Sequence, residues 1–153
     1  MKRVFAFCLP LACVFMLGGC ADYKLKKQIG ETLSLDLSKA EIVEQWSDRG
    51  WFNDGNSLVV FALPKEAVGE LQALADAEKG NGWREMPLTG EVFNIFYGEN
   101  GYDDSWFRNN QTGEKVIPDI ADGYWWYLGD TVNFDFAAFD ASTNLLYYYE
   151  FDS

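Results

Sequence analysis

The strongest constraint on the fold lies near the end of the sequence, where short turns separate three apolar runs. These runs are rich in the aromatic side chains that favour strands. They read GYWWYLG, VNFDFAAFD and NLLYYYEFD. In the last two runs, apolar and polar side chains partly alternate, as they do in a strand with one buried face. The pattern therefore predicts an antiparallel three-strand meander.

Earlier in the chain, two further regions have the pattern of strands. Residues 33–37 alternate leucine with polar side chains, which predicts a half-buried strand. Apolar runs at 42–46 and 58–63 flank a segment rich in Asp, Asn and Gly, so we expect a hairpin with a wide loop. For residues 39–46, helix propensity leaves a helix open as the alternative.

One helix is predicted from the residues that follow Pro64. Proline fits the first turn of a helix, and an apolar stripe begins with Val68 and Leu71. Residues 90–97 fit either a two-turn helix or a short strand. Together these elements predict an α+β fold, in which one main helix at about residues 65–79 packs on an antiparallel sheet of about five to six strands that includes the meander.

The amino-terminal segment has the features of an export signal. Lys2 and Arg3 precede an apolar run that ends at Leu17, which is short for a membrane-spanning helix. The run closes with LGGC, residues 17–20. This arrangement resembles the signal of a bacterial lipoprotein precursor. The resemblance implies cleavage before Cys20 and lipidation of that residue, and hence an extracytoplasmic protein anchored to a bacterial membrane by N-terminal lipid.

Two alternatives remain open for this segment: an ordinary secretory signal that ends in cysteine by chance, and a short uncleaved membrane anchor. On the lipoprotein interpretation, residues 1–19 are the signal peptide, 20–28 are the lipidated cysteine and a tether, and 29–153 are a single globular domain. The tether contains three lysines. We interpret them as part of a plain spacer, although they could also contact anionic lipid headgroups.

Cleavage would also limit the chemistry that the chain can perform. Cys8 and Cys13 would leave with the signal peptide, and lipid would block the sulfur of Cys20, so no free thiol would remain. The chain contains no histidine. Nucleophiles and metal sites that depend on thiolate or imidazole are therefore excluded, and we expect no cofactor.

The composition is strongly acidic. The 24 acidic residues outnumber 12 basic ones, giving a formal net charge of −12, which becomes −14 when Lys2 and Arg3 are lost with the signal peptide. This charge would repel a phosphate backbone, so we expect no nucleic-acid partner. It favours a basic protein partner, although the solubility of a secreted domain is sufficient to explain it.

Three stretches of the chain also resemble a group of small secreted or lipid-anchored proteins of Gram-positive bacteria. They are SDRGWFNDGN (47–56), GYWWYL (123–128) and NLLYYYEFD (144–152). The resemblance implies one α+β domain and supplies no activity and no catalytic residue. Members of the group often have histidines in the first stretch, where this chain has Arg49 and Asn53, so an imidazole-based role does not carry over.

A candidate binding surface follows from the alternation within the meander. Asp135 and Glu150 mark the faces of their strands that we expect to contact water. Tyr148 and one of Trp125 and Trp126 could share that surface. Aromatic rings beside carboxylates suit a protein interface or a sugar-binding face. The alternative is that the helix and neighbouring strands cover these rings as ordinary packing.

Oxygen-bearing side chains in the predicted hairpin loop are candidates for a calcium site. They are Asp48, Asn53, Asp54 and Asn56. Their spacing does not match an EF-hand, and Asx turns explain the same residues without a metal. A second cluster is a candidate on the same grounds and comprises Asp103, Asp104, Asn109, Asn110 and Glu114.

The sequence therefore predicts a non-catalytic envelope lipoprotein whose acidic, aromatic-rich domain binds another protein. A glycan- or solute-binding module is the first alternative. The second is an enzyme that hydrolyses wall sugars through two carboxylates. The sequence has no nucleophile motif and no phosphate-binding loop, which makes catalysis the least favoured of these hypotheses.

Overall fold

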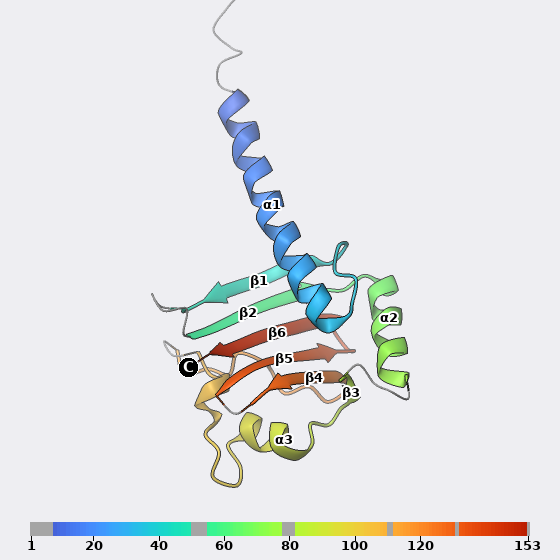
Figure 1. Ribbon diagram of the computed structural model, residues 1–153, viewed down its shortest axis with the longest axis vertical. Helices are drawn as coiled ribbons and strands as arrows, with labels where there is room; N and C mark the ends of the chain where they lie inside the picture. Colours follow the sequence, from blue (N-terminus) through green and yellow to red (C-terminus); the bar gives the residue numbers. More distant parts are fainter. Residues whose placement is uncertain (1–7, 50–54, 78–81, 110–111, 131, 153) are drawn as a thin grey trace, which may run out of the picture.

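The computed structural model describes residues 8–49, 55–77, 82–109, 112–130 and 132–152. Within these ranges the chain forms an antiparallel sheet of six strands, with helices packed on both of its faces (Figure 1). This architecture confirms the predicted α+β fold, with its sheet, its main helix and its C-terminal meander.

The boundaries of the elements are as follows. The strands are β1 (Glu41–Ser47), β2 (Gly55–Ala62), β3 (Arg84–Glu85), β4 (Gly123–Gly129), β5 (Asn133–Asp140) and β6 (Leu145–Asp152). The helices are α1 (Cys8–Leu33), α2 (Lys65–Asp76) and α3 (Gly90–Tyr97), and a short 3₁₀ helix, η1, spans Asp104–Phe107. The strand order across the sheet is β1-β2-β6-β5-β4-β3. None of the helices in the described ranges combines the length and the hydropathy needed to cross a bilayer.

The structure decides the segments for which the sequence allowed two interpretations. Residues 39–46 contribute most of strand β1 and are not a helix, whereas residues 90–97 form helix α3 and are not a strand. The predicted main helix is α2, which ends at Asp76, about one turn earlier than expected. The predicted hairpin is formed by β1 and β2, which pair in antiparallel register.

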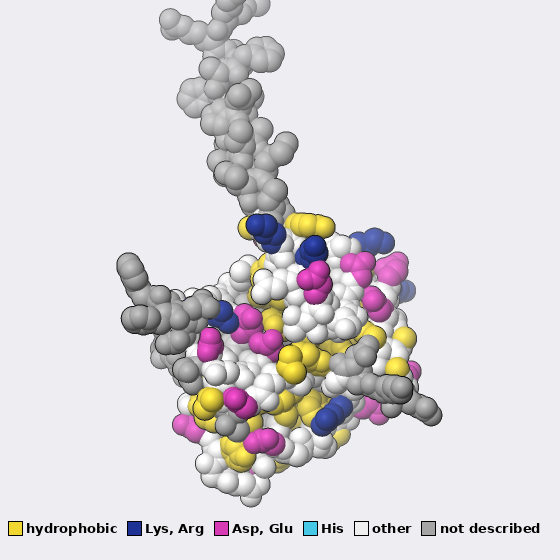
Figure 2. All heavy atoms as spheres, viewed as in Figure 1, with side chains coloured by type: hydrophobic (Ala, Val, Ile, Leu, Met, Phe, Trp, Pro, Cys, Tyr) yellow, Lys and Arg dark blue, Asp and Glu magenta, His cyan; other side chains and the backbone are white. Residues whose placement is uncertain are grey.

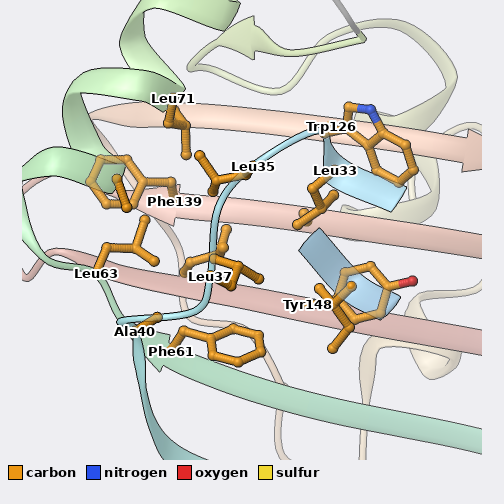
Figure 3. Close-up of a cluster of buried hydrophobic side chains, with 14 of the residues drawn as sticks. Leu33, Leu35, Leu37, Ala40, Phe61, Leu63, Leu71, Trp126, Phe139 and Tyr148 are labelled. Atoms are coloured by element: carbon orange, nitrogen blue, oxygen red, sulfur yellow. The ribbon is translucent and has the colours of Figure 1, made fainter. Parts of the chain in front are cut away.

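Different elements cover the two faces of the sheet. The end of α1, residues 34–40 and α2 pack on one face, above Phe61 and Phe139 (Figure 3). Helix α3 and η1 pack on the other face, around Phe136 and Tyr149. Because both faces are covered, the central strands bury side chains on both sides and not on alternate positions alone.

The predicted strand at residues 33–37 is wrong. Helix α1 continues to Leu33, and an irregular connection then leads to β1. Ser34 has a positive φ of 56°, and the N–H of Leu35 donates to the carbonyl oxygen of Gly30 at 2.9 Å. This pattern is that of a Schellman helix end. The alternating leucines are therefore the terminus of a helix and the turn after it, and all of them are buried.

Candidate functional site

Polar side chains gather at one end of the sheet face that carries α1. Ser57 of β2 pairs with Glu150 of β6, and Glu150 pairs with Asp135 of β5. The three residues therefore form a row across neighbouring strands, with their side chains on one face. Tyr148, two residues before Glu150 on the same strand, shares this face. The register of the central strands thus brings together residues as far as 93 positions apart.

Glu150 has two close polar neighbours. The guanidinium of Arg49 lies 3.1 Å from its carboxylate, and the hydroxyl of Ser57 donates to the same oxygen at 2.8 Å. Arg49 follows β1 closely, at the point where the carboxylate of Asp48 accepts the backbone N–H of Asn56 at 2.6 Å. That hydrogen bond joins the ends of the hairpin strands and so places Arg49 beside β6. The ion pair, about a quarter exposed on each side, holds the side chain of Glu150 in place.

Asp135 has a different environment. Its carboxylate faces the hydroxyl of Tyr148, which also lies near the side chain of Thr32 in α1. Burial raises the pKa of Asp135 above its ordinary value, and the charge of Glu150 adds to the rise. The hydroxyl of Tyr148 and the charge of Arg49 oppose it. No lysine or arginine in the described ranges forms an ion pair with Asp135. The site therefore contains a half-buried carboxylate that forms no ion pair of its own, because the nearby Arg49 pairs with Glu150.

Asp135 and Glu150 line an open groove of about 460 Å³. Its charged walls are Arg49, Asp135, Glu150 and Asp152. Beside them lies the apolar side chain of Leu128, which is 57% exposed. Three carboxylates and one guanidinium give the groove a net negative charge. Such a groove can bind an ammonium or guanidinium group through its carboxylates while the aliphatic stem of the same side chain packs on the leucine.

The structure contradicts the prediction that one of the two tryptophans of β4 faces water. Trp125 and Trp126 point to opposite faces, as neighbours on a strand must. Trp125 is 1% exposed in the core that includes α3, and Trp126 is 5% exposed in the core beneath α1 (Figure 3). The indole N–H of Trp125 donates to the backbone oxygen of Glu85 at 3.2 Å. Both rings are therefore core residues, as the packing alternative proposed.

Of the five residues predicted for the binding surface, the structure brings Asp135, Tyr148 and Glu150 together. The expectation that the ring of Tyr148 is exposed is wrong, because only 3% of this residue is accessible beneath α1. Its hydroxyl alone reaches the polar row. Sequence reasoning missed Arg49 and Ser57. The alternation in β2 could have identified Ser57, but nothing local signals Arg49, whose position depends on how the hairpin closes.

The calcium candidates in the hairpin gain no support. Asn53 and Asp54 lie outside the described residues. The carboxylate of Asp48 accepts the N–H of Asn56, and Asn56 is itself 3% exposed. In the part of the chain that the structure covers, no three acidic or cysteine side chains are grouped as a metal site requires.

The second acidic cluster is also explained by local contacts. Asp103 accepts the backbone N–H of Ser105 and so caps η1. Asp104 forms an ion pair with Arg108 four residues later, which lowers the pKa of Asp104. Asn110 lies outside the described residues. These contacts stabilise a short 3₁₀ turn and leave no reason to invoke a cation.

The groove at the end of β5 and β6 is therefore the candidate site, since it combines a half-buried carboxylate, a partly buried ion pair and an exposed apolar side chain. Its chemistry is that of a receptor for a cationic group. Comparisons with protein-family models, with curated proteins and with solved structures find no match for this chain.

Proposed function

We propose that this protein is an extracytoplasmic lipoprotein, anchored to a bacterial membrane through Cys20, whose acidic groove binds a basic segment of another protein without catalysis. The observation that carries the proposal is Asp135, a half-buried carboxylate with a raised pKa and no ion-pair partner in the described ranges. Keeping this charge out of water is unfavourable for the free protein. A lysine or arginine from a partner would supply the missing counter-charge.

Two features of the groove favour a protein partner over a small cation. Leu128 is largely exposed next to the carboxylates, so an amphipathic side chain gains both apolar and polar contacts there. The net charge of −14 expected after cleavage extends the attraction beyond the groove and would accelerate association with a basic surface.

The alternative functions have weaker support. A sugar-binding face needs an exposed ring, and Trp125 and Trp126 are both buried. A glycoside hydrolase needs two carboxyl groups that flank the scissile bond. Asp135 and Glu150 are instead direct cross-strand partners, which project side by side from one face of the sheet. This arrangement suits joint recognition of one cation better than attack from two sides.

The proposal is tested by calorimetric titration of the protein with a short peptide of alternating lysine and alanine. We expect saturable binding that weakens as salt is raised from about 0.01 M to about 0.15 M, because counter-charges are screened over this range. The variant Asp135→Asn should lose most of the affinity. A peptide with glutamate in place of lysine should not bind.

The matched control is Glu99→Gln, which removes one exposed carboxylate after α3 and leaves the groove intact. It changes the net charge by the same amount as Asp135→Asn. If the two variants weakened the affinity for the peptide equally, binding would depend only on the overall charge of the protein. The groove would then have no specific role.

A further inference from the structure

Helix α1 joins the proposed lipid anchor to the body without an interruption. The helix spans Cys8–Leu33 and therefore runs through Cys20. The part from Cys20 to Leu33 would be about 20 Å long at the usual rise of about 1.5 Å per residue. The predicted tether, residues 20–28, is thus the first part of a helix that ends inside the protein core.

Several contacts fix this helix to the sheet. Ile29 is 3% exposed and Leu33 is fully buried. The indole N–H of Trp83 donates to the carbonyl oxygen of Leu33 at 3.2 Å, which satisfies one of the free carbonyls at the helix end. Thr32 lies near the hydroxyl of Tyr148, and its own hydroxyl donates to the carbonyl oxygen of Gln28 at 3.1 Å. Because these contacts hold the last turn of α1 against the sheet, the direction of the helix relative to the body is set.

The outer part of the helix carries charge of the opposite sign to the body. Lys24 and Lys27 are exposed and Lys26 is partly exposed. Figure 2 shows basic side chains where α1 leaves the body and acidic side chains spread over the body below. Tyr23, an aromatic residue of the kind enriched at membrane interfaces, is 63% exposed. Lys27 forms only a long, exposed ion pair with Glu31, at 3.8 Å, which does not withdraw it from other partners.

We infer that residues 21–27 of α1 contact the headgroups of anionic lipids, and that the helix holds the body in a fixed orientation on the membrane with α3 turned away from it. The inference rests on the proposed anchoring at Cys20. The anionic membrane surface attracts the lysines and repels the acidic body, so both forces turn the body away from the membrane. Helix α3 lies at the end of the body opposite to the start of α1 (Figure 1). A flexible tether would transmit no such orientation.

The test uses the lipidated protein in vesicles of phosphatidylcholine and phosphatidylglycerol, with a nitroxide spin label at either end of the molecule. Labelling is clean because the mature chain has no cysteine besides the lipidated one. The variants are Tyr23→Cys, on the outer part of α1, and Glu99→Cys, just after α3. We expect the label at position 23 to be shielded from a water-soluble nickel relaxant and the label at position 99 to be fully accessible.

A lysine-free variant tests the role of charge. Lys24→Gln, Lys26→Gln and Lys27→Gln are combined with Tyr23→Cys, and the shielding at position 23 should then be lost. The variant that keeps its lysines should also lose the shielding at position 23 when the vesicles contain phosphatidylcholine alone. Shielding that survives both changes would overturn the assignment of anionic lipid as the partner.

Flotation of the vesicles separates this inference from the proposed function. If the wild-type protein does not float with the vesicles, or if Cys20→Ser floats equally well, the proposed anchoring fails. If the wild type floats and Cys20→Ser does not, the anchoring holds. If the anchoring holds and the label at position 23 is accessible, or positions 23 and 99 are equally shielded, the proposed fixed orientation is wrong. The proposed anchoring would stand.

Discussion

Asp135 lies where its charge is disfavoured. Its pKa is raised mainly by burial, and the neighbouring carboxylate of Glu150 adds to the effect. A raised pKa in an acid means that the folded state binds the proton more tightly than the unfolded state does. The free energy of unfolding therefore falls as pH rises from the ordinary pKa of 3.8 through the higher pKa of the folded protein. The charged carboxylate therefore lowers the stability of the folded protein at neutral pH.

Replacement of Asp135 by asparagine should raise the melting temperature at about pH 7 and change it little below the ordinary pKa, where the carboxyl group is protonated in both states. Asparagine has a side-chain oxygen that can accept a hydrogen bond from the hydroxyl of Tyr148. Calorimetric melting curves at the two pH values measure the difference, with Glu99→Gln as the control for net charge. A lower melting temperature at neutral pH would show that the carboxylate stabilises the fold.

For individual residues of the site, the sequence predictions were partly right and partly wrong. Alternation along β5 and β6 predicts that Asp135 and Glu150 share one face, which is correct because strand periodicity needs no tertiary information. The expectation that this face contacts water holds only at its end, because α1 and α2 cover Phe139 and Tyr148 on the same face. The exposure of Trp125 or Trp126 could not be judged in the same way. It depends on whether a second layer covers each face, and the helices that do so come from distant parts of the chain.

At the scale of elements, the end of α1 shows how a short pattern misleads. Leucines at 33, 35 and 37 have the period of a strand, but Ile29 and Leu33 are one helical turn apart on the same buried face. The helix stops at Ser34, in a conformation that glycine or asparagine more often adopts, so the sequence carries no clear stop signal. Gly30 takes part instead, because its missing side chain lets the chain fold back.

Substitution Gly30→Ala tests this view of the helix end. A Cβ atom at position 30 would lie 2.6 Å from the carbonyl oxygen of Leu35, so the turn after the helix must shift. We expect a loss of about 1–3 kcal/mol in the free energy of unfolding, measured by urea denaturation. Gly69→Ala, in the middle of α2, is the matched control. A Cβ there meets nothing within 4 Å, and alanine should add about 0.5–1 kcal/mol.

If both glycine variants changed stability in the same direction, the close approach at Gly30 would not be limiting. The helix end would then have enough freedom to adjust to a side chain at position 30.

At the scale of the whole molecule, the layer arrangement was predictable only in part. The meander and α2 follow from strand and helix periodicity, and together they require an α+β fold. The positions of α1 and α3 on opposite faces could not be predicted from periodicity. The segment that forms α1 resembles a signal sequence, and the segment that forms α3 is an ambiguous apolar run. Both layers are nevertheless needed to bury the aromatic side chains of the sheet.

The acidity of the whole chain gives a prediction of its own. With a formal charge of −14 expected after cleavage, self-repulsion should destabilise the compact state at low ionic strength. We expect the melting temperature to rise as sodium chloride increases from about 0.01 M to about 0.15 M, since the screening length falls from about 30 Å to about 8 Å.

Sodium sulfate at equal ionic strength serves as the control for this measurement. Screening predicts the same rise with either salt, whereas preferential exclusion of sulfate would raise the melting temperature further. A melting temperature that does not change with sodium chloride would mean that ion pairs within the fold already balance the repulsion.

The position of β6 has a consequence for when the protein can fold. This strand comes last among the elements, yet it lies inside the sheet between β2 and β5. Its pairing with β2 joins residues as distant as Gly55 and Asp152, so the two halves of the sheet cannot be fully joined until residue 152 has been synthesised. Such long-range pairing slows folding. A nascent chain that lacks β6 cannot close its sheet, so the export that we propose would act on a chain whose core is still incomplete.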